Sequence, residues 1–378
     1  MSKTLILAKE LAMFENNTID TPIIDSMFNF NRKLGEDSAI FFGSPRGLHD
    51  SVVVKHPYLA QLYDSQIATN WKYNEFSLAK DREQMQHCPK GIKDLMLYNI
   101  LFQWHLDSVA ADQLFPLFSP FITNSEASRL FCKNDDMEYT HALTYSEIVR
   151  QCVSDREELE VFIKDIEQVR ERLIPALDYL EELKDVGHRY ALGELREKEA
   201  YEAVLKGLVC WWCMERIQFA VSFAVTFAVV QQGWFHGIGN YVQKIMLDEL
   251  NIHANTMKYV IRHELSTDKG KKAWENIRSD CLEIVDTFLM CEYDWARFIV
   301  SDGRGIVGLT EEVLKRSARY EAEEVYNTLF GLTLGVVDNP TPYMAQWLNP
   351  DNTQNANQEI ENGNYLLNSV VNDINEKL

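Results

Sequence analysis

Seven stretches of the chain carry apolar residues at the three-to-four-residue spacing that is typical of helices with one buried face. They span about 90–121, 125–153, 155–185, 195–231, 236–264, 271–300 and 309–333. Asn124 precedes the second stretch and is followed by Ser125 and Glu126, which predicts a helix start with an acidic first turn. Gly233 follows the most apolar stretch and is expected to end that helix. The pattern predicts an all-α bundle without a central sheet.

The two ends of the chain lack this pattern. Proline and glycine gather in the first ~60 residues and again after Val336. The segment from Asn349 onward is rich in asparagine and poor in core-forming side chains, a composition typical of disorder. Its short apolar segment Tyr365-Leu366-Leu367 could dock on a partner. We expect an irregular N-terminal arm (1–55), one helical bundle (56–340) and a flexible C-terminal tail (341–378).

The composition supports one large helical domain with a substantial core. The chain has 378 residues, of which 46% are hydrophobic, including 8 Trp, 16 Tyr and 19 Phe. Its formal net charge of −20 argues against a nucleic acid or an anionic membrane as partner, because both require a basic surface.

The most apolar segment, Ile217 to Val230, is shorter than the roughly 20 residues that span a bilayer. It is also interrupted by Gln218, Ser222 and Thr226. We interpret it as a buried helix. The N-terminus lacks the basic leader and the small-residue cleavage site of a signal peptide.

The cysteine content indicates a reducing compartment. Seven cysteines, an odd number in a large chain, form no disulfide framework and fit a cytoplasmic protein. Cys210 and Cys213 have the C-x-x-C spacing, but no second pair completes a zinc site. Since they lie within an apolar helical stretch, we expect two buried core thiols.

One motif in the second stretch has the spacing of a metal site. Glu138 and His141 are three residues apart, so an α-helix separates them by about 60° around its axis and about 4.5 Å along it. The carboxylate and the imidazole can therefore bind the same metal ion. Tyr145 lies one turn further along the same face, where its phenol would be near such an ion. A metal site beside a tyrosine indicates oxygen activation and one-electron chemistry.

Three other stretches place carboxylates in apolar surroundings, where an unpaired charge is costly to bury. They contribute Asp107, Glu215, the pair Asp248-Glu249, and His253. Ferritin-like di-metal bundles take one carboxylate from each of two helices and Glu-x-x-His from each of two others, which is nearly the set present here. Taken singly, each residue has an ordinary structural explanation, such as an ion pair between Glu215 and Arg216. Their occurrence on four helices, in the required order, favours a ferritin-like bundle with a di-metal site.

The types of donor atom also narrow the choice of metal. Carboxylates and imidazoles together suit iron or manganese, and the absence of thiolates argues against a structural zinc or an iron–sulfur cluster. Phe219 and Phe223 follow Glu215 by four and eight residues, on the same helical face. We expect them to wall a dry pocket around Tyr145, because an oxidised phenol persists only where water and reductants are kept away.

These residues belong to a longer set of motifs that resembles the small (beta) subunit of class I ribonucleotide reductase over most of the chain. In chain order the motifs are Ile40-Phe-Phe-Gly43, Trp71, Leu106-Asp107-Ser108, Glu138-x-x-His141-x-x-x-Tyr145, Glu215-Arg-Ile-Gln-Phe219-x-Val-Ser-Phe223, Asp248-Glu249, Asn349-Pro-Asp-Asn-Thr-Gln and Gln358-Glu-Ile-Glu361-x-x-x-Tyr365-Leu366. The separations between Trp71, Asp107 and Glu138 fit the family pattern without a gap.

The resemblance implies a site, a mechanism and a partner. One metal ion would be bound by Asp107, Glu138 and His141, and the other by Glu215, Glu249 and His253, as a centre of two iron ions that activates dioxygen. Tyr145 would be oxidised to a stable radical. Trp71, hydrogen-bonded through Asp248 toward His141, and then Tyr365 would pass the oxidising equivalent to the large (alpha) catalytic subunit, which reduces ribonucleotides to deoxyribonucleotides. The resemblance also implies a homodimer whose C-terminal tail docks on that subunit.

The sequence departs from the family at the last ligand helix. The family has Glu-x-x-His there, whereas here Leu250 stands three residues before His253 and Glu249 stands four before it. In an α-helix, Glu249 and His253 would be about 40° apart and about 6 Å along the axis, close enough to share an ion. A one-residue π-bulge would also restore the usual geometry. Both alternatives are open from the sequence.

Two other functions are compatible with the same residues. A different ferritin-like oxidase or monooxygenase would use the metal pair directly on a small substrate, but it would give no reason for Trp71 or for Tyr365 in the tail. Metal storage, or a purely structural bundle, is the non-enzymatic alternative. The sequence leaves open the metal (two iron ions, two manganese ions or one of each), the need for an activating flavoprotein, a cellular or viral origin, and the regulation of the enzyme.

Overall fold

The computed structural model describes residues 28–30, 32–36, 39–153 and 167–349. Within these residues the chain is helical, with two isolated β-bridges and no strand. The helices are α2 (Pro57–Ala68), α3 (Ala79–His87), α4 (Lys90–Phe118), α5 (Ser125–Cys152), α7 (Glu167–Ala191), α8 (Glu197–Cys213), α9 (Ala220–Gln231), α10 (His236–Asp248), α11 (Ala254–Ser266), α12 (Asp268–Ile299), α13 (Glu311–Phe330) and α14 (Ala345–Leu348), with a 3-10 turn, η4, at Pro342–Met344. Two π-helical turns, η2 (Met214–Gln218) and η3 (Glu249–His253), join α8 to α9 and α10 to α11.

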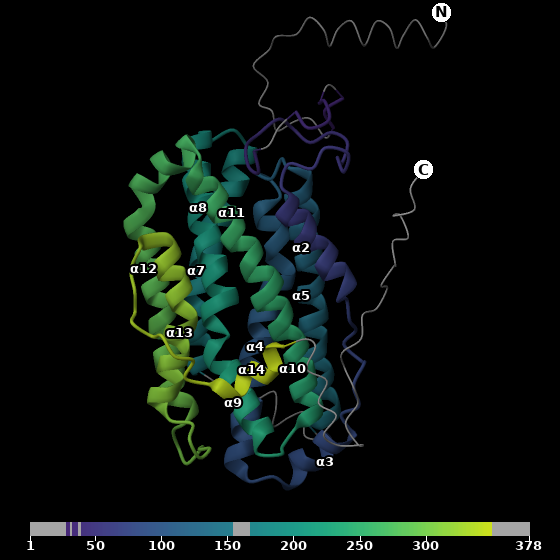
Figure 1. Cartoon of the computed structure of the whole chain (residues 1–378), viewed down its shortest axis with the longest axis vertical. Helices are drawn as coiled ribbons and strands as arrows, with labels where there is room; N and C mark the ends of the chain where they lie inside the picture. Colours follow the sequence, from purple (N-terminus) through teal and green to yellow (C-terminus); the bar gives the residue numbers. More distant parts are fainter. Residues whose placement is uncertain (1–27, 31, 37–38, 154–166, 350–378) are drawn as a thin grey trace, which may run out of the picture.

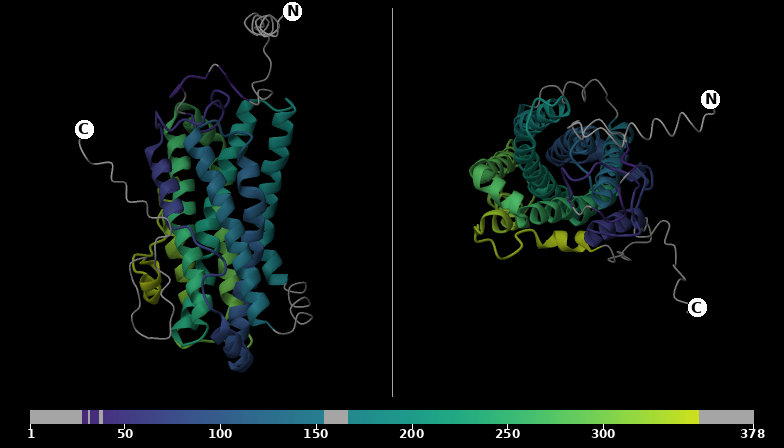
Figure 2. Two further views of the ribbon diagram at one scale, coloured as in Figure 1. Left: turned by 90° about the vertical axis from the view of Figure 1, so that its right-hand side faces the viewer. Right: turned by 90° about the horizontal axis from the view of Figure 1, so that it is seen from above.

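The long helices run side by side along the long axis of the molecule (Figures 1 and 2). Helix α4 packs against α5, α7 and α9, and α8 packs against α7, α11 and α12. The two π-helical turns contact each other in the interior. The all-α bundle predicted from the apolar spacing is thereby confirmed.

The segment from α8 through α9 occupies the centre of the bundle. Every residue from Ala220 to Val230 is buried. Among the described residues, Glu197–Gln231 is the one helical segment long and apolar enough to cross a membrane, and 94% of its most apolar window is buried inside the bundle. Its apolar surface is therefore covered by neighbouring helices, as expected for a core helix.

Most helix ends lie within a few residues of their predicted positions. Asn124 caps α5, its side chain accepting the backbone N–H of Ala127 at 2.9 Å. Gly233 follows α9 with a φ of +87°, a conformation that favours glycine. Helix α7 continues past residue 185 to Ala191, so Gly187 lies inside a helix. Residues 154–166, where the predicted helix 155–185 begins, lie outside the described residues.

Two short helices before α4, α2 and α3, were not predicted from the sequence. Helix α3 is mostly polar and buries only Asp81 and Met85, so its sequence has no apolar periodicity. Helix α2 begins with Pro57 at its first position, where the missing N–H costs nothing. It supplies Gln66 to the site described below.

The chain segments at both ends of the described region pack on the bundle. Phe42 N–H donates to the carbonyl of Phe121, and Thr123 N–H to that of Ile40, so the arm follows the α4–α5 turn. At the other end, Trp347 stacks on Phe227 at 4.8 Å between ring centroids. The structured region therefore extends to α14, beyond residue 340. Tyr365 and its apolar neighbours lie outside the described residues.

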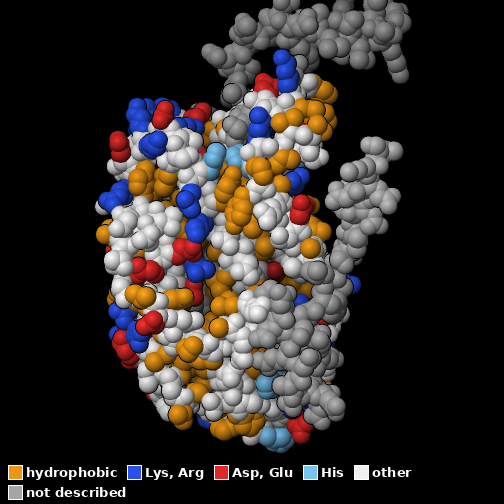
Figure 3. Space-filling model, in the orientation of Figure 1, with side chains coloured by type: hydrophobic (Ala, Val, Ile, Leu, Met, Phe, Trp, Pro, Cys, Tyr) orange, Lys and Arg blue, Asp and Glu red, His pale blue; other side chains and the backbone are white. Residues whose placement is uncertain are grey.

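The surface carries charges of both signs (Figure 3), and the cysteines are free thiols, as the sequence predicted for Cys210 and Cys213. On the face shown in Figure 3, acidic and basic side chains are interspersed over the described residues. Cys210 and Cys213 are buried in α8 and are free thiols, like the other five cysteines. Burial raises the pKa of the Cys213 thiol, which keeps it protonated and inert.

Candidate metal centre

The six predicted ligands come together in the interior from four helical segments. Asp107 comes from α4, Glu138 and His141 from α5, Glu215 from η2, and Glu249 and His253 from η3. None is more than 2% exposed. Their donor atoms form two sets, Asp107, Glu138, His141 and Glu249, and Glu138, Glu215, Glu249 and His253, each with all donor atoms within 4.8 Å of one another. With metal–oxygen bonds of about 2.0–2.2 Å, each set is compact enough to surround one ion.

Glu138 and Glu249 belong to both sets. The Glu249 carboxylate places Oε1 2.9 Å from His141 Nδ1 and Oε2 2.9 Å from His253 Nδ1. Glu138 likewise lies 3.4 Å from His141 Nδ1 and 2.9 Å from His253 Nδ1. The family resemblance implied one ion for each of these two carboxylates, whereas the geometry allows each to contact two. The two sets therefore form one continuous cluster of donors.

Two of the four segments that carry predicted ligands are π-helical. The turn η3 contains Glu249 and His253 and accommodates one extra residue. The side chains of this i,i+4 pair therefore converge, with Glu249 Oε2 2.9 Å from His253 Nδ1. The π-helical alternative is thus the one the structure contains. A second π-helical turn, η2, carries Glu215. It was not predicted, because a single ligand on a helix leaves no spacing to reveal it.

The charge balance of the cluster favours a cation. Burial and the neighbouring carboxylates Glu138 and Glu249 raise the pKa of Asp107 well above its usual range. Burial alone would lower the pKa of His253, but Glu249 and Glu138 raise it to about 10. The field that attracts a proton to His253 equally attracts a metal ion.

Asp107 provides the most direct test of fit to a metal. Both of its carboxylate oxygens are buried and have no hydrogen-bond partner among the described residues. A buried carboxylate without partners is strongly unfavourable unless a cation binds it. Together with an all-oxygen and imidazole donor set, this orphaned group fits iron or manganese at the site.

A hydrogen-bonded chain leads from the cluster to Trp71, which lies in the loop after α2. His141 Nε2 lies 3.1 Å from Asp248 Oδ2, which also accepts the indole N–H of Trp71 at 2.7 Å. Gln66 donates to the other Asp248 oxygen at 2.9 Å. Asp248 can accept a hydrogen bond from His141 Nε2–H, which leaves His141 Nδ1 without a proton and able to bind metal. Metal-bound histidines commonly have such a partner on their second ring nitrogen. The Trp71 ring stacks on His141 with centroids 5.7 Å apart.

Tyr145 is fully buried on α5, and its hydroxyl has no hydrogen-bond partner among the described residues. Burial raises the pKa of the phenol well above its ordinary value, and the charges of Asp107, Glu249 and Glu138 raise it further. The phenol is therefore protonated, so removal of an electron must be accompanied by loss of its proton. Phe219 and Phe223 are buried as expected and stack on each other at 5.2 Å.

Two functional contacts were missed from the sequence. Trp211 N–H donates to Glu215 Oε1 at 2.5 Å. Its position four residues before Glu215 places it on the same helical face, a signal that could have been used. The contact of Gln66 with Asp248 could not be foreseen, because it depends on how α2 docks.

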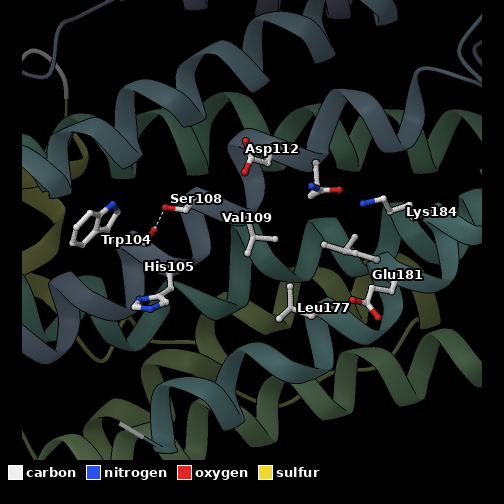
Figure 4. Close-up of a pocket in the computed structure, with 10 residues that line it drawn as sticks. Trp104, His105, Ser108, Val109, Asp112, Leu177, Glu181 and Lys184 are labelled. Atoms are coloured by element: carbon white, nitrogen blue, oxygen red, sulfur yellow. Dashed lines mark hydrogen bonds between the residues drawn. The ribbon is translucent and has the colours of Figure 1, made fainter. Parts of the chain in front are cut away.

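A separate groove lies between α4 and α7 (Figure 4) and has a volume of about 510 Å³. Trp104, His105, Val109 and Leu177 line it, with Glu181 and Lys184 at one end. None of the six ligands contributes to its wall. The groove is therefore distinct from the candidate metal centre.

Comparison with known sequences identifies relatives that match this chain over most of its length. The family described as "Ribonucleotide reductase, small chain" matches residues 50–331. The chain is 24% identical over 351 residues to ribonucleoside-diphosphate reductase 1 subunit beta of Escherichia coli O157:H7, covering 89% of this chain and 93% of that protein. It is also 24% identical over 383 residues to the subunit beta of Enterobacteria phage T4, with 94% and 98% covered.

Solved structures share the fold. The ribonucleotide reductase R2 subunit from Clostridium botulinum has a TM-score of 0.71 at 19% identity, covering 85% of this chain and 98% of that one. The dimanganese(II)-NrdF of Streptococcus sanguinis has a TM-score of 0.63 at 14% identity, covering 79% and 98%. The matched family spans more than half of the chain, including all six predicted ligands. The chain therefore belongs to the small-subunit family of class I ribonucleotide reductase, the oxidoreductase that reduces ribonucleoside diphosphates.

Proposed function

We propose that this subunit holds a dinuclear metal centre that generates a tyrosyl radical at Tyr145 and supplies it to the large catalytic subunit. The observation that carries the proposal is the pair of ligand sets sharing Glu138 and Glu249 on the helices around Tyr145. A bound pair of iron or manganese ions supplies the chemistry that reduces dioxygen and produces a one-electron oxidant. The residues around it decide where that oxidising power goes.

The protein prepares Tyr145 for oxidation in two ways. Complete burial excludes water and external reductants from the phenol. The carboxylates of Asp107, Glu138 and Glu249 raise the pKa of the phenol, and they equally favour a positive charge nearby. When the electron leaves, the phenolic proton must leave with it, and the product is a neutral radical. Phe219 and Phe223 would keep the surroundings of that radical dry.

The path to the large subunit begins at the hydrogen-bonded chain Trp71–Asp248–His141. Asp248 can hold the indole proton of Trp71 while an electron moves, because its Oδ2 already accepts that N–H at 2.7 Å. Tyr365 in the C-terminal tail would receive the oxidising equivalent and deliver it to the large subunit, on which the tail docks. A ferritin-like oxidase that acts directly on its own substrate would keep its activity without the tail.

We place iron first among the candidate metals, as a centre of two iron ions. The donor set fits manganese equally well by ligand type, and one neighbour in fold is described as a dimanganese(II) protein. We further propose that the subunit is a homodimer and acts in the cytoplasm, where free thiols such as those of this chain persist.

Paramagnetic resonance tests this function. The apoprotein is loaded with ferrous iron, exposed to oxygen and examined for a tyrosyl signal. Tyr145→Phe should abolish the signal while iron content stays at the wild-type value. Tyr201→Phe is the matched control, because Tyr201 is equally buried but bonds Glu264 instead of facing the centre, and it should keep the signal. A tyrosyl signal that survives in Tyr145→Phe would overturn the assignment.

A further inference from the structure

A buried ion pair lies beside the metal centre without belonging to it. Arg172 of α7 is 2% exposed and Glu292 of α12 is fully buried, and Arg172 Nε donates to Glu292 Oε1 at 2.6 Å. The guanidinium also lies over the rings of Phe102 and Trp295, 3.5 and 4.7 Å from their centroids. Neither charged residue contributes a donor to the two ligand sets.

The pair contacts the backbone where the π-helical turn η2 meets α9. Arg172 donates to the carbonyl oxygen of Gln218, the last residue of η2, and to Ser222 Oγ at 3.0 Å. In return, Gln218 Nε2 donates to the carbonyl oxygen of Arg172 at 2.5 Å. Glu292 Oε2 accepts the backbone N–H of Val221 at 3.1 Å. One side chain thus binds the end of η2 and the other the start of α9.

This junction needs such partners. The carbonyl of Ile217, which an α-helix would pair with Val221 N–H, accepts instead from Phe219 N–H. The first N–H groups of a helix otherwise lack partners, and its N-terminus favours a negative charge. Glu292 meets both needs at the start of α9, and Arg172 supplies a positive charge at the carbonyl end of η2. The positive charge thus faces the carbonyl group that ends η2, and the negative charge faces the N–H group at the start of α9.

Glu215 lies within η2, three residues before Gln218. It belongs to one ligand set only, the one with His253. We propose that Arg172 and Glu292 are positioning residues that hold the π-helical turn and thereby place Glu215 at the second metal position. This inference rests on the proposed dinuclear function. It assigns the pair a role in one of the two ion sites and none in the other.

Manganese(II) titration of the full-length apoprotein, followed by the resonance of free Mn(II), tests the inference. The double variant Arg172→Met/Glu292→Leu removes both contacts without leaving a single buried charge. It should bind one Mn(II) with wild-type affinity and the second about 10–100-fold more weakly, the range for loss of a supporting contact. General loosening of the bundle would weaken both ions together.

Arg304→Met is the matched control. Arg304 is also buried, lies over two aromatic rings and donates to backbone carbonyls, those of Phe298 and Ile299 near the end of α12. It contributes nothing to η2, and its variant should bind two ions as the wild type does. Arg172→Lys is a milder change, since one ammonium cannot reproduce the forked contacts to Glu292 and Gln218. It should weaken the second ion alone, by less than the double variant does.

The outcomes separate the two proposals. Two ions bound with wild-type affinity by Arg172→Lys, or by a folded double variant, would overturn the positioning role while leaving the dinuclear centre intact. Equal weakening of both ions would overturn it as well. A wild-type protein that binds fewer than two Mn(II) ions would instead count against the proposed function itself.

Discussion

The sharing of Glu138 and Glu249 between the two ligand sets predicts how many ions each substitution removes. Asp107→Ala leaves every donor of the set that contains Glu215 and His253. It should therefore cost one ion of two. Glu249→Ala removes a donor from both sets at once, so neither ion should remain tightly bound.

The expected effect can be measured as metal-induced stabilisation. A ligand that binds only the folded state adds about 2.7 kcal/mol at a free concentration of one hundred times its Kd. With an unfolding entropy of about 2.1 cal/mol/K per residue, a chain of 378 residues gains about 1.3 °C in Tm per kcal/mol. Two ions should thus raise the Tm of the wild type by about 7 °C, and one ion should raise that of Asp107→Ala by about half as much.

The assay compares calorimetric Tm values of each variant with and without Mn(II), and counts bound ions by elemental analysis. Comparing each variant with its own apoprotein cancels the change in intrinsic stability that the substitution causes. Glu264→Ala serves as control, because Glu264 is a buried carboxylate that bonds Tyr201 rather than the centre, and it should keep the full shift. If Glu249→Ala retained the same metal-induced shift as Asp107→Ala, Glu249 would not be shared and the dinuclear geometry would be wrong.

Two further predictions follow from the surroundings of the centre. Asp248→Ala removes the acceptor for Trp71 and His141, so reductase activity with the large subunit should fall about 10–100-fold while the Tyr145 radical still forms; loss of radical and activity in equal proportion would contradict a role in transfer. Asp135→Asn tests a pH effect: burial raises the pKa of this carboxyl to about 6, so its ionised form is disfavoured in the folded state. The resulting loss in the free energy of unfolding is absent below about pH 4, grows as the pH rises to about 6 and is constant above that pH. The Asn side chain can still accept Phe115 N–H, which Asp135 accepts at 2.9 Å. Because Asp135 is only half-buried, the variant should be about 1 kcal/mol more stable than the wild type at pH 8 and equally stable at pH 4, as measured by urea unfolding. The same difference at both pH values would refute this.

The sequence was sufficient for the helices that bury a continuous apolar face, and it identified the carboxylates and histidines that the structure brings together in the interior. Asp107 and Glu215 stood out because a carboxylate within an apolar helix needs a cation or a partner, and both are buried in the centre. The contact from Trp71 to Asp248 was expected through the family resemblance and has the expected geometry. Helix α3 lacked an apolar face and was missed for that reason. The role of Tyr365 stays a prediction, because the residue lies outside the described part of the chain.

The features that escaped prediction are those that depend on contacts distant in sequence. A break in a buried helix exposes backbone groups that no local residue can satisfy, so it requires partners from other helices. Arg172 lies 46 residues before the Gln218 carbonyl that it binds, and Glu292 lies 71 residues after the Val221 N–H that it accepts. In η3, by contrast, Glu249 and His253 are one residue further apart than in the family pattern, and this spacing offered a π-helical turn as one of two alternatives. A π-helical ligand turn therefore leaves a signal in the sequence only when two ligands bracket it, and with a single ligand it must be inferred from the buried side chains that bind its ends.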